Sequence, residues 1–214
     1  MKTFLLLMLS CLMLTSVFVN AQNNPVKAAE NPLASYSPLW NQQKFMDCNT
    51  GATIKYFSKK EKEVIWILNM LRLDPQLFLE TVLLNQTNPE YMDPGNRDEN
   101  YLSLMADLKN LKPANKLLMP DYAAYQSAYC HAVTSGKTGY VGHDRRGSCK
   151  ADFYGECCDY GNEDPLQALL DLLIDRYVAS LGHRYICLSP NYSSIGVSIQ
   201  PHKGYRINYV LDFK

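Results

Sequence analysis

The sequence predicts an α+β fold in which helices pack on a small antiparallel sheet. Three observations predict this class. Helix-capping residues precede segments whose apolar residues recur with the spacing of a helix. In two segments near the C-terminus, apolar and polar residues alternate as in a strand. The 214 residues are also sufficient for one domain with a substantial core. Helices and a small sheet in one domain favour a layered arrangement.

The first 21 residues have the form of a signal peptide. Lys2 precedes an apolar run over residues 4–19, and a Val-Asn-Ala sequence ends at Ala21, a typical cleavage site. We therefore expect a secreted, periplasmic or cell-surface protein with no stable transmembrane segment after cleavage. Two alternatives remain open. A membrane anchor would need a longer run, and lipidation at Cys11 is disfavoured because the apolar run continues past it.

Removal of this leader changes the charge and the cysteine count. The full chain has 21 basic and 21 acidic side chains, and loss of Lys2 leaves a net charge of −1. A nearly neutral chain without a basic stripe is not typical of nucleic-acid binding. Six cysteines remain once Cys11 is removed, and an even number in an exported chain predicts up to three disulfides of open pairing. These are Cys48, Cys130, Cys149, Cys157, Cys158 and Cys187. The adjacent Cys157 and Cys158 should point in opposite directions and take different partners.

The N-terminal part of the mature chain is predicted to be an arm. Residues 22–56 are rich in Asn, Pro and Ser and have no sustained periodicity. Trp40, Phe45 and a disulfide-bonded Cys48 would hold this arm on the body. The folded domain is then residues 57–214.

Helix signals follow in the first half of this domain. Ser58 and Glu61 form a capping-box sequence before an apolar stripe that includes Val64 and Leu71. Asp74-Pro75 begins a second, short helix. Residues 85–100 are rich in turn formers and predict a loop, and residues 101–111 predict a further helix.

The second half contains two more helices and a hairpin. Asp121 begins a helix that we expect to contain a packed His131 and to stop at Gly136. Residues 139–160 are predicted to be irregular. Asp164-Pro165 begins a strongly apolar helix expected to end near residues 181–182. Residues 194–199 and 205–213 alternate as two strands joined by a turn.

Three polar residues are candidates for one site, namely His143, Glu156 and His183. Two imidazoles and a carboxylate suit a borderline divalent ion, for which zinc is the leading choice. The same groups could instead form a metal-free acid–base cluster or a structural hydrogen-bond network. A nucleophile at Ser180 is less favoured than a helix cap, and one at Cys157 or Cys158 is less favoured than a disulfide.

Several of these segments together resemble the CAP superfamily, the SCP-like proteins that include cysteine-rich secretory, antigen 5 and pathogenesis-related 1 proteins. The bacterial secreted branch is the most similar. The matching segments are Cys130-His131-Ala132, Gly142-His143-Asp144, Gly155-Glu156, Ser180-Leu-Gly-His-Arg184 and Ile195-Gly-Val-Ser-Ile199. The resemblance implies an α/β/α sandwich with a central cleft lined by two histidines and two acidic residues. By position, His143 and His183 are the histidines and Glu156 is one acidic residue. The second acidic position aligns with Ser180, and the usual tryptophan aligns with Tyr177.

Two functions follow from this resemblance. The first is a non-enzymatic binding module that holds a divalent metal and a small apolar or lipid-like ligand, or an extracellular partner. The second is a metal-assisted or acid–base hydrolase of peptides or cell-envelope polymers, in which His143, Glu156 and His183 are catalytic. We favour the binding module because the set lacks a recognisable nucleophile.

Overall fold

A four-stranded sheet organises the computed structural model, which describes residues 30–86, 99–176 and 178–214. The strands lie in the order β1 (Met119–Pro120), β3 (Ser194–His202), β4 (Arg206–Phe213) and β2 (Gly155–Tyr160). β3 and β4 form the predicted antiparallel pair, and β2 adds to β4, also antiparallel. The short β1 pairs with β3 in parallel, so the whole sheet is mixed. The leader predicted at residues 1–21 lies outside the described residues.

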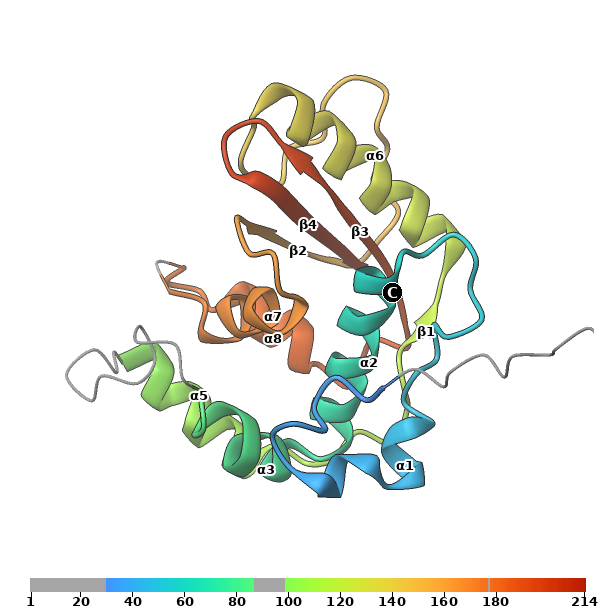
Figure 1. The fold of residues 1–214 in the computed structure, drawn as a ribbon. Helices are drawn as coiled ribbons and strands as arrows, with labels where there is room; N and C mark the ends of the chain where they lie inside the picture. The colour runs from blue at the N-terminus through green and yellow to red at the C-terminus, as the bar shows by residue number, and fades with distance from the viewer. Residues whose placement is uncertain (1–29, 87–98, 177) are drawn as a thin grey trace, which may run out of the picture.

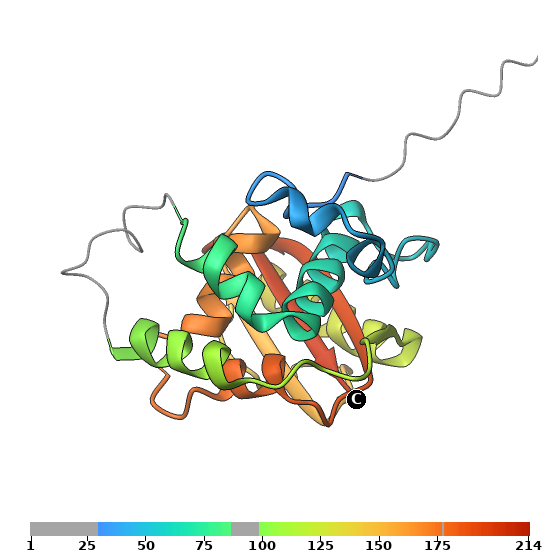
Figure 2. The same cartoon turned by 90° about the horizontal axis from the view of Figure 1, so that it is seen from below.

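Helices cover both faces of the sheet (Figure 1). α6 (Tyr122–Thr138) packs on one face, against β3 and β4. α2 (Lys59–Leu73), α7 (Pro165–Ile174) and α8 (Gly182–Leu188) pack on the other. Figure 2 views this second layer from below, together with α3 (Pro75–Phe78), the π-helical turn η2 (Leu79–Leu83) and α5 (Glu99–Asn110). Within the described residues, no helix has both the length and the apolar character needed to cross a bilayer.

The predicted helix starts at Ser58, Asp121 and Asp164 are confirmed. Ser58 and Glu61 form a complete capping box at α2, with each side chain accepting from the other residue's backbone amide. Asp121 caps α6 through the amide of Ala124 at 2.7 Å, and Asp164 caps α7. These short polar side chains accept from amides that have no partner inside the helix, which explains why they mark helix starts so well.

Two predicted helix ends are wrong. α6 continues past Gly136 to Thr138 and is capped by Gly139, which adopts a left-handed conformation with φ 75°. Gly136 instead allows a close approach, because a Cβ there would lie 2.1 Å from the carbonyl oxygen of Pro201. α7 ends at Ile174 because Asp175 turns left-handed with φ 57°, and His183 belongs to the separate helix α8.

The two faces of the sheet differ in character. On β4, Tyr209, Leu211 and Phe213 join the main hydrophobic core. Their neighbours on the opposite face include Asn208, whose amide donates to the Ala132 carbonyl of α6 at 3.1 Å, and the buried Asp212. Buried polar groups therefore lie on the α6 side of β4, opposite the main hydrophobic core.

Strand β2 corrects the prediction of an irregular segment over residues 139–160. Its six residues pair with β4 from Gly155–Phe213 to Tyr160–Asn208. Cys157 and Cys158 point to opposite faces of this strand, as predicted. Cys157 lies in the main core, and Cys158 lies on the α6 side with Ala128 and Val210.

The N-terminal arm packs closely on the body. It contains the 3₁₀ helix η1 (Pro38–Asn41) and the short helix α1 (Gln43–Met46). Trp40 and Phe45 are fully buried, as predicted, and the Trp40 indole donates to the Thr81 hydroxyl at 2.9 Å. Cys48 is also buried but carries a free thiol, which approaches the Lys44 carbonyl. Hydrophobic burial, rather than a disulfide at Cys48, therefore holds the arm.

Among the cysteines that the structure describes, one disulfide is present, between Cys130 of α6 and Cys149 of the following loop. The expectation of up to two further disulfides is not met, since the structure has free thiols at Cys48, Cys157, Cys158 and Cys187. Two of these thiols are neighbours: the sulfurs of Cys157 and Cys187 lie 3.8 Å apart, beyond the length of a disulfide bond.

Candidate functional site

The structure brings His143 and His183 together, although 40 positions separate them in the chain. His143 lies in the loop after α6, and His183 is the second residue of α8. Their Nε2 atoms are 3.3 Å apart, and the ring centroids are 5.4 Å apart. The pair is accessible, since the His143 side chain is 51% exposed and that of His183 is 16% exposed.

Each imidazole is held from behind by a carboxylate. His143 Nδ1 lies 2.9 Å from Glu156 Oε1, and His183 Nδ1 lies 2.8 Å from Asp175 Oδ1. An ionised carboxylate only accepts, so each Nδ1 carries the proton and donates. In the neutral ring this tautomer leaves Nε2 with a lone pair. The two lone pairs then face one another, and they repel unless a proton or a cation lies between them.

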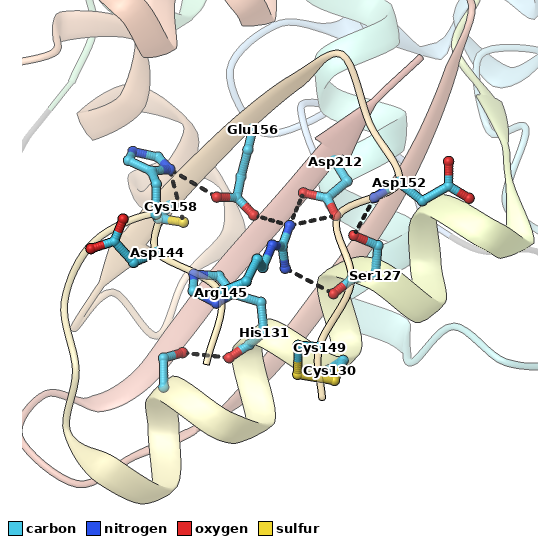
Figure 3. Close-up of polar contacts among 12 residues, drawn as sticks. Ser127, Cys130, His131, Asp144, Arg145, Cys149, Asp152, Glu156, Cys158 and Asp212 are labelled. Atoms are coloured by element: carbon cyan, nitrogen blue, oxygen red, sulfur yellow. Dashed lines mark hydrogen bonds and ion pairs between the residues drawn. A yellow bond between two sulfur atoms is a disulfide. The ribbon is translucent and has the colours of Figure 1, made fainter. Parts of the chain in front are cut away.

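Glu156 belongs to a buried charge cluster on the α6 side of the sheet (Figure 3). Arg145 Nη2 contacts Glu156 Oε2 and lies 3.1 Å from Asp212 Oδ2. Its Nη1 donates to the Ser127 carbonyl of α6 at 3.0 Å. The guanidinium therefore ties β2, β4 and α6 together directly beneath the histidine pair.

The protonation of this cluster follows from its surroundings. Burial and the nearby charge of Glu156 raise the pKa of Asp212 to about 8, although Ser127 and Arg145 oppose the shift. Burial also acts to raise the pKa of Glu156, but the hydrogen bond from His143 and the charge of Arg145 lower it overall. Near neutral pH the proton is therefore on Asp212, and the single charge of Glu156 is matched by Arg145.

Glu156 was predicted to lie beside the two histidines as a third metal ligand, but both of its oxygens are engaged in this network. One of its oxygens accepts from His143 and the other from Arg145. It orients the His143 ring and fixes the tautomer. Arg145 and Asp212 were missed at the sequence level, because nothing in their spacing distinguishes a cluster member from an ordinary surface arginine or strand aspartate.

A second acidic residue beside the histidine pair is Asp175, five positions before Ser180. Its Oδ2 accepts the backbone amides of His183 at 3.0 Å and Arg184 at 3.4 Å. It thus also caps α8, whose N-cap residue Leu181 makes no side-chain cap bond. The cap predicted at Ser180 is therefore wrong, and the capping carboxylate comes from the turn that ends α7.

A second group of potential ligands lies deeper. His131, Glu156 and Cys158 offer atoms within 4.8 Å of one another, and all three residues are buried. His131 is packed, as predicted, with Nε2 2.9 Å from the Gly142 carbonyl oxygen, and burial lowers its pKa. Burial raises the pKa of the Cys158 thiol well above its usual value. A cation here would have to displace that thiol proton and compete with Arg145 for Glu156. Neither obstacle applies to the Nε2 atoms of His143 and His183.

A hollow lies on the outer side of α8, away from the histidine pair. It has a volume of about 480 Å³ and is lined mainly by apolar atoms of Leu111, Tyr185, Leu188 and Pro190. Asp107, Asn110 and Ser189 complete its wall.

Comparison of the chain with protein-family models, with curated proteins and with solved structures found no match in any of the three. The resemblance to the CAP superfamily therefore rests on the sequence segments quoted for it.

Proposed function

We propose that this chain is a secreted, CAP-like binding module that holds a divalent metal, zinc, through Nε2 of His143 and His183. The separation of 3.3 Å between these atoms carries the proposal. Two nitrogen ligands each about 2.0–2.1 Å from a tetrahedral zinc ion lie roughly 3.3–3.4 Å apart. The pair therefore has the spacing of two adjacent ligands before any ion arrives.

The carboxylates behind the rings support the same role. Metal-binding histidines usually donate their other ring N–H to a carboxylate or carbonyl, which fixes the tautomer and increases the basicity of the ligand nitrogen. Glu156 and Asp175 make this contact to His143 and His183. With each Nδ1 donating to its carboxylate, the Nε2 atom of each ring is left to bind a metal.

Two protein ligands leave the remaining coordination positions to water or to a bound molecule. Such a centre presents a metal to a ligand rather than enclosing it. In the described part of the chain, each Nε2 approaches the other Nε2, and neither makes a hydrogen bond with a hydroxyl or a thiol. The thiol of Cys158 approaches His143 from the Nδ1 side at 3.7 Å and is buried. This arrangement favours binding over a mechanism with a side-chain nucleophile, and the apolar hollow beside α8 is our proposed place for an apolar ligand.

Metal binding is tested with the purified chain by titration with zinc in the presence of a competing chelator. His143→Ala and His183→Ala should each weaken zinc binding at least about 100-fold, because each removes half of the protein ligands. Asp144→Ala is the matched control, since it changes an exposed neighbour of His143. Unchanged zinc affinity in either histidine variant would refute the proposal.

The same proteins distinguish binding from hydrolysis. They are incubated with casein and with peptidoglycan, and products are followed by mass spectrometry. We expect no turnover by the zinc-loaded chain. Turnover that both histidine substitutions abolish, and that Asp144→Ala retains, would show that the site is a hydrolase centre.

A further inference from the structure

The pair of buried thiols at Cys157 and Cys187 has no part in the site described above. Cys157 is in the middle of β2, and Cys187 is on the last turn of α8. Both are fully buried in the main core, and their sulfurs are 3.8 Å apart. The Cys157 sulfur also lies 3.6 Å from the carbonyl oxygen of His183. The two sulfurs are in contact, with each lying on a different layer of the fold.

We propose that Cys157 and Cys187 form a second disulfide, which links β2 to α8. The sulfurs are 3.8 Å apart and need to approach by roughly 1.8 Å to reach the usual bond length of about 2.05 Å. The bond forms by exchange with a disulfide of the oxidising compartment, such as oxidised glutathione or a protein disulfide. The two thiols lose two protons and two electrons, and the incoming disulfide is reduced to two thiols.

The position of these sulfurs determines when the exchange takes place. Thiol–disulfide exchange requires access of the incoming sulfur, and neither cysteine is accessible in the folded chain. The bond therefore forms while the chain folds, before α8 closes over β2. Once formed, it is shielded from reductants. The Cys130–Cys149 disulfide is only half-buried and joins α6 to a loop, so it should be reduced first.

The other free thiols provide an internal contrast. Cys48 lies in the N-terminal arm beside the Lys44 carbonyl, and Cys158 points to the opposite face of β2 beside His143. Among the described residues, neither is paired with another cysteine. The mature protein should therefore contain two disulfides and two free thiols.

A link at this place also bears on the histidine pair, and this step rests on the proposed function. Cys157 follows Glu156, which orients His143, and Cys187 lies one helical turn after His183. The disulfide would join the two elements that set the separation of the Nε2 atoms. We expect the oxidised chain to hold the pair at its spacing, and the unlinked chain to bind zinc more weakly.

The experiment uses the full chain expressed with export into an oxidising compartment. The protein is unfolded without reductant, alkylated with iodoacetamide and mapped by mass spectrometry. The expected result is alkylation at Cys48 and Cys158 and a cross-linked peptide pair containing Cys187. Because Cys157 and Cys158 share a proteolytic peptide, Cys158→Ala should keep the cross-link and Cys157→Ala should lose it. Alkylation of Cys187 in the wild-type protein, or a cross-link that survives Cys157→Ala, would overturn the proposal.

Two further measurements keep the result distinct from that of the metal proposal. Graded reduction should open Cys130–Cys149 before Cys157–Cys187, and loss of the second bond should lower the melting temperature by about 7–15 °C. The peptide map does not depend on zinc. A cross-linked chain that binds no zinc would refute the metal site and leave the disulfide standing, and the reverse result would do the opposite.

Discussion

Replacing Asp175 tests how the site fixes the tautomer of His183. In Asp175→Asn, one of the two accepting oxygens becomes an amino group, while both backbone amides and Nδ1–H of His183 still need an acceptor. If the amino group faces the ring, Nδ1 must accept and the proton moves to Nε2, which removes the metal-binding lone pair. If it faces the backbone, α8 loses a capping contact.

The magnitudes of these effects distinguish Asp175→Asn from a second variant, Asp175→Ala. Loss of a carboxylate that supports a metal-binding histidine typically weakens metal affinity about 10–100-fold, equivalent to roughly 1.4–2.8 kcal/mol. Asparagine tolerates the left-handed conformation of residue 175, whereas alanine adds a conformational cost of about 1–2 kcal/mol and removes the cap, worth about 1 kcal/mol. Asp175→Asn should therefore lose zinc affinity with little loss of stability, and Asp175→Ala should lose both.

The assays are chelator-competition titration with zinc, urea unfolding, and nitrogen-15 NMR of the imidazole rings to identify the tautomer. Asp144→Asn is the control, because it removes a nearby exposed charge without touching either ring. Zinc affinity in Asp175→Asn within about twofold of the wild type, with His183→Ala still defective, would show that this carboxylate does not prepare the ring.

Three other substitutions test the supporting structure. Burial raises the pKa of Asp159 to about 7, so the unfolded chain binds fewer protons than the folded chain between about pH 4 and 7 and stability falls as pH rises through this window. Asp159→Asn should remove that fall, and above pH 7 its free energy of unfolding in urea should exceed that of the wild type by on the order of 2–4 kcal/mol. Parallel pH profiles of the two proteins would contradict this. Arg145→Met should destabilise the fold by about 3–5 kcal/mol, because it leaves the ionised Glu156 buried without its partner, and an unchanged unfolding midpoint would count against the charge cluster. Gly196→Ala should cost at least about 1–3 kcal/mol, since a Cβ there would lie 2.0 Å from a backbone nitrogen of α6; wild-type stability would show that α6 is not packed so closely.

The elements that could be predicted from the sequence are those specified by local chemistry. Ser58, Asp121 and Asp164 cap helices because their side chains accept from amides two or three residues away, which is a relation within one short segment. The hairpin of β3 and β4 is marked by alternation and a turn. The meeting of His143 and His183 could also be predicted, but through the family resemblance rather than through spacing.

The elements that were missed depend on contacts between distant segments. β2 shows no polar–apolar alternation because helices cover both of its faces, and its residues Glu156, Cys158 and Asp159 are all buried polar or thiol groups. Asp175 follows an apolar helical pattern and gives no sign that the chain turns left-handed there. Its role depends on α8, because the backbone amides and the His183 ring that it contacts belong to that helix.

The histidine pair divides the site into an outer and an inner half. The imidazole edges face solvent, whereas the side chains of Glu156 and Asp175 are each only 2% exposed. On the proposed function, a ligand would meet the histidine nitrogens and not the carboxylates that orient them. Substitutions of exposed residues around the pair would then change which ligand binds without changing the ionisation of the rings. Substitutions of Glu156 or Asp175 would change the rings without changing the exposed surface.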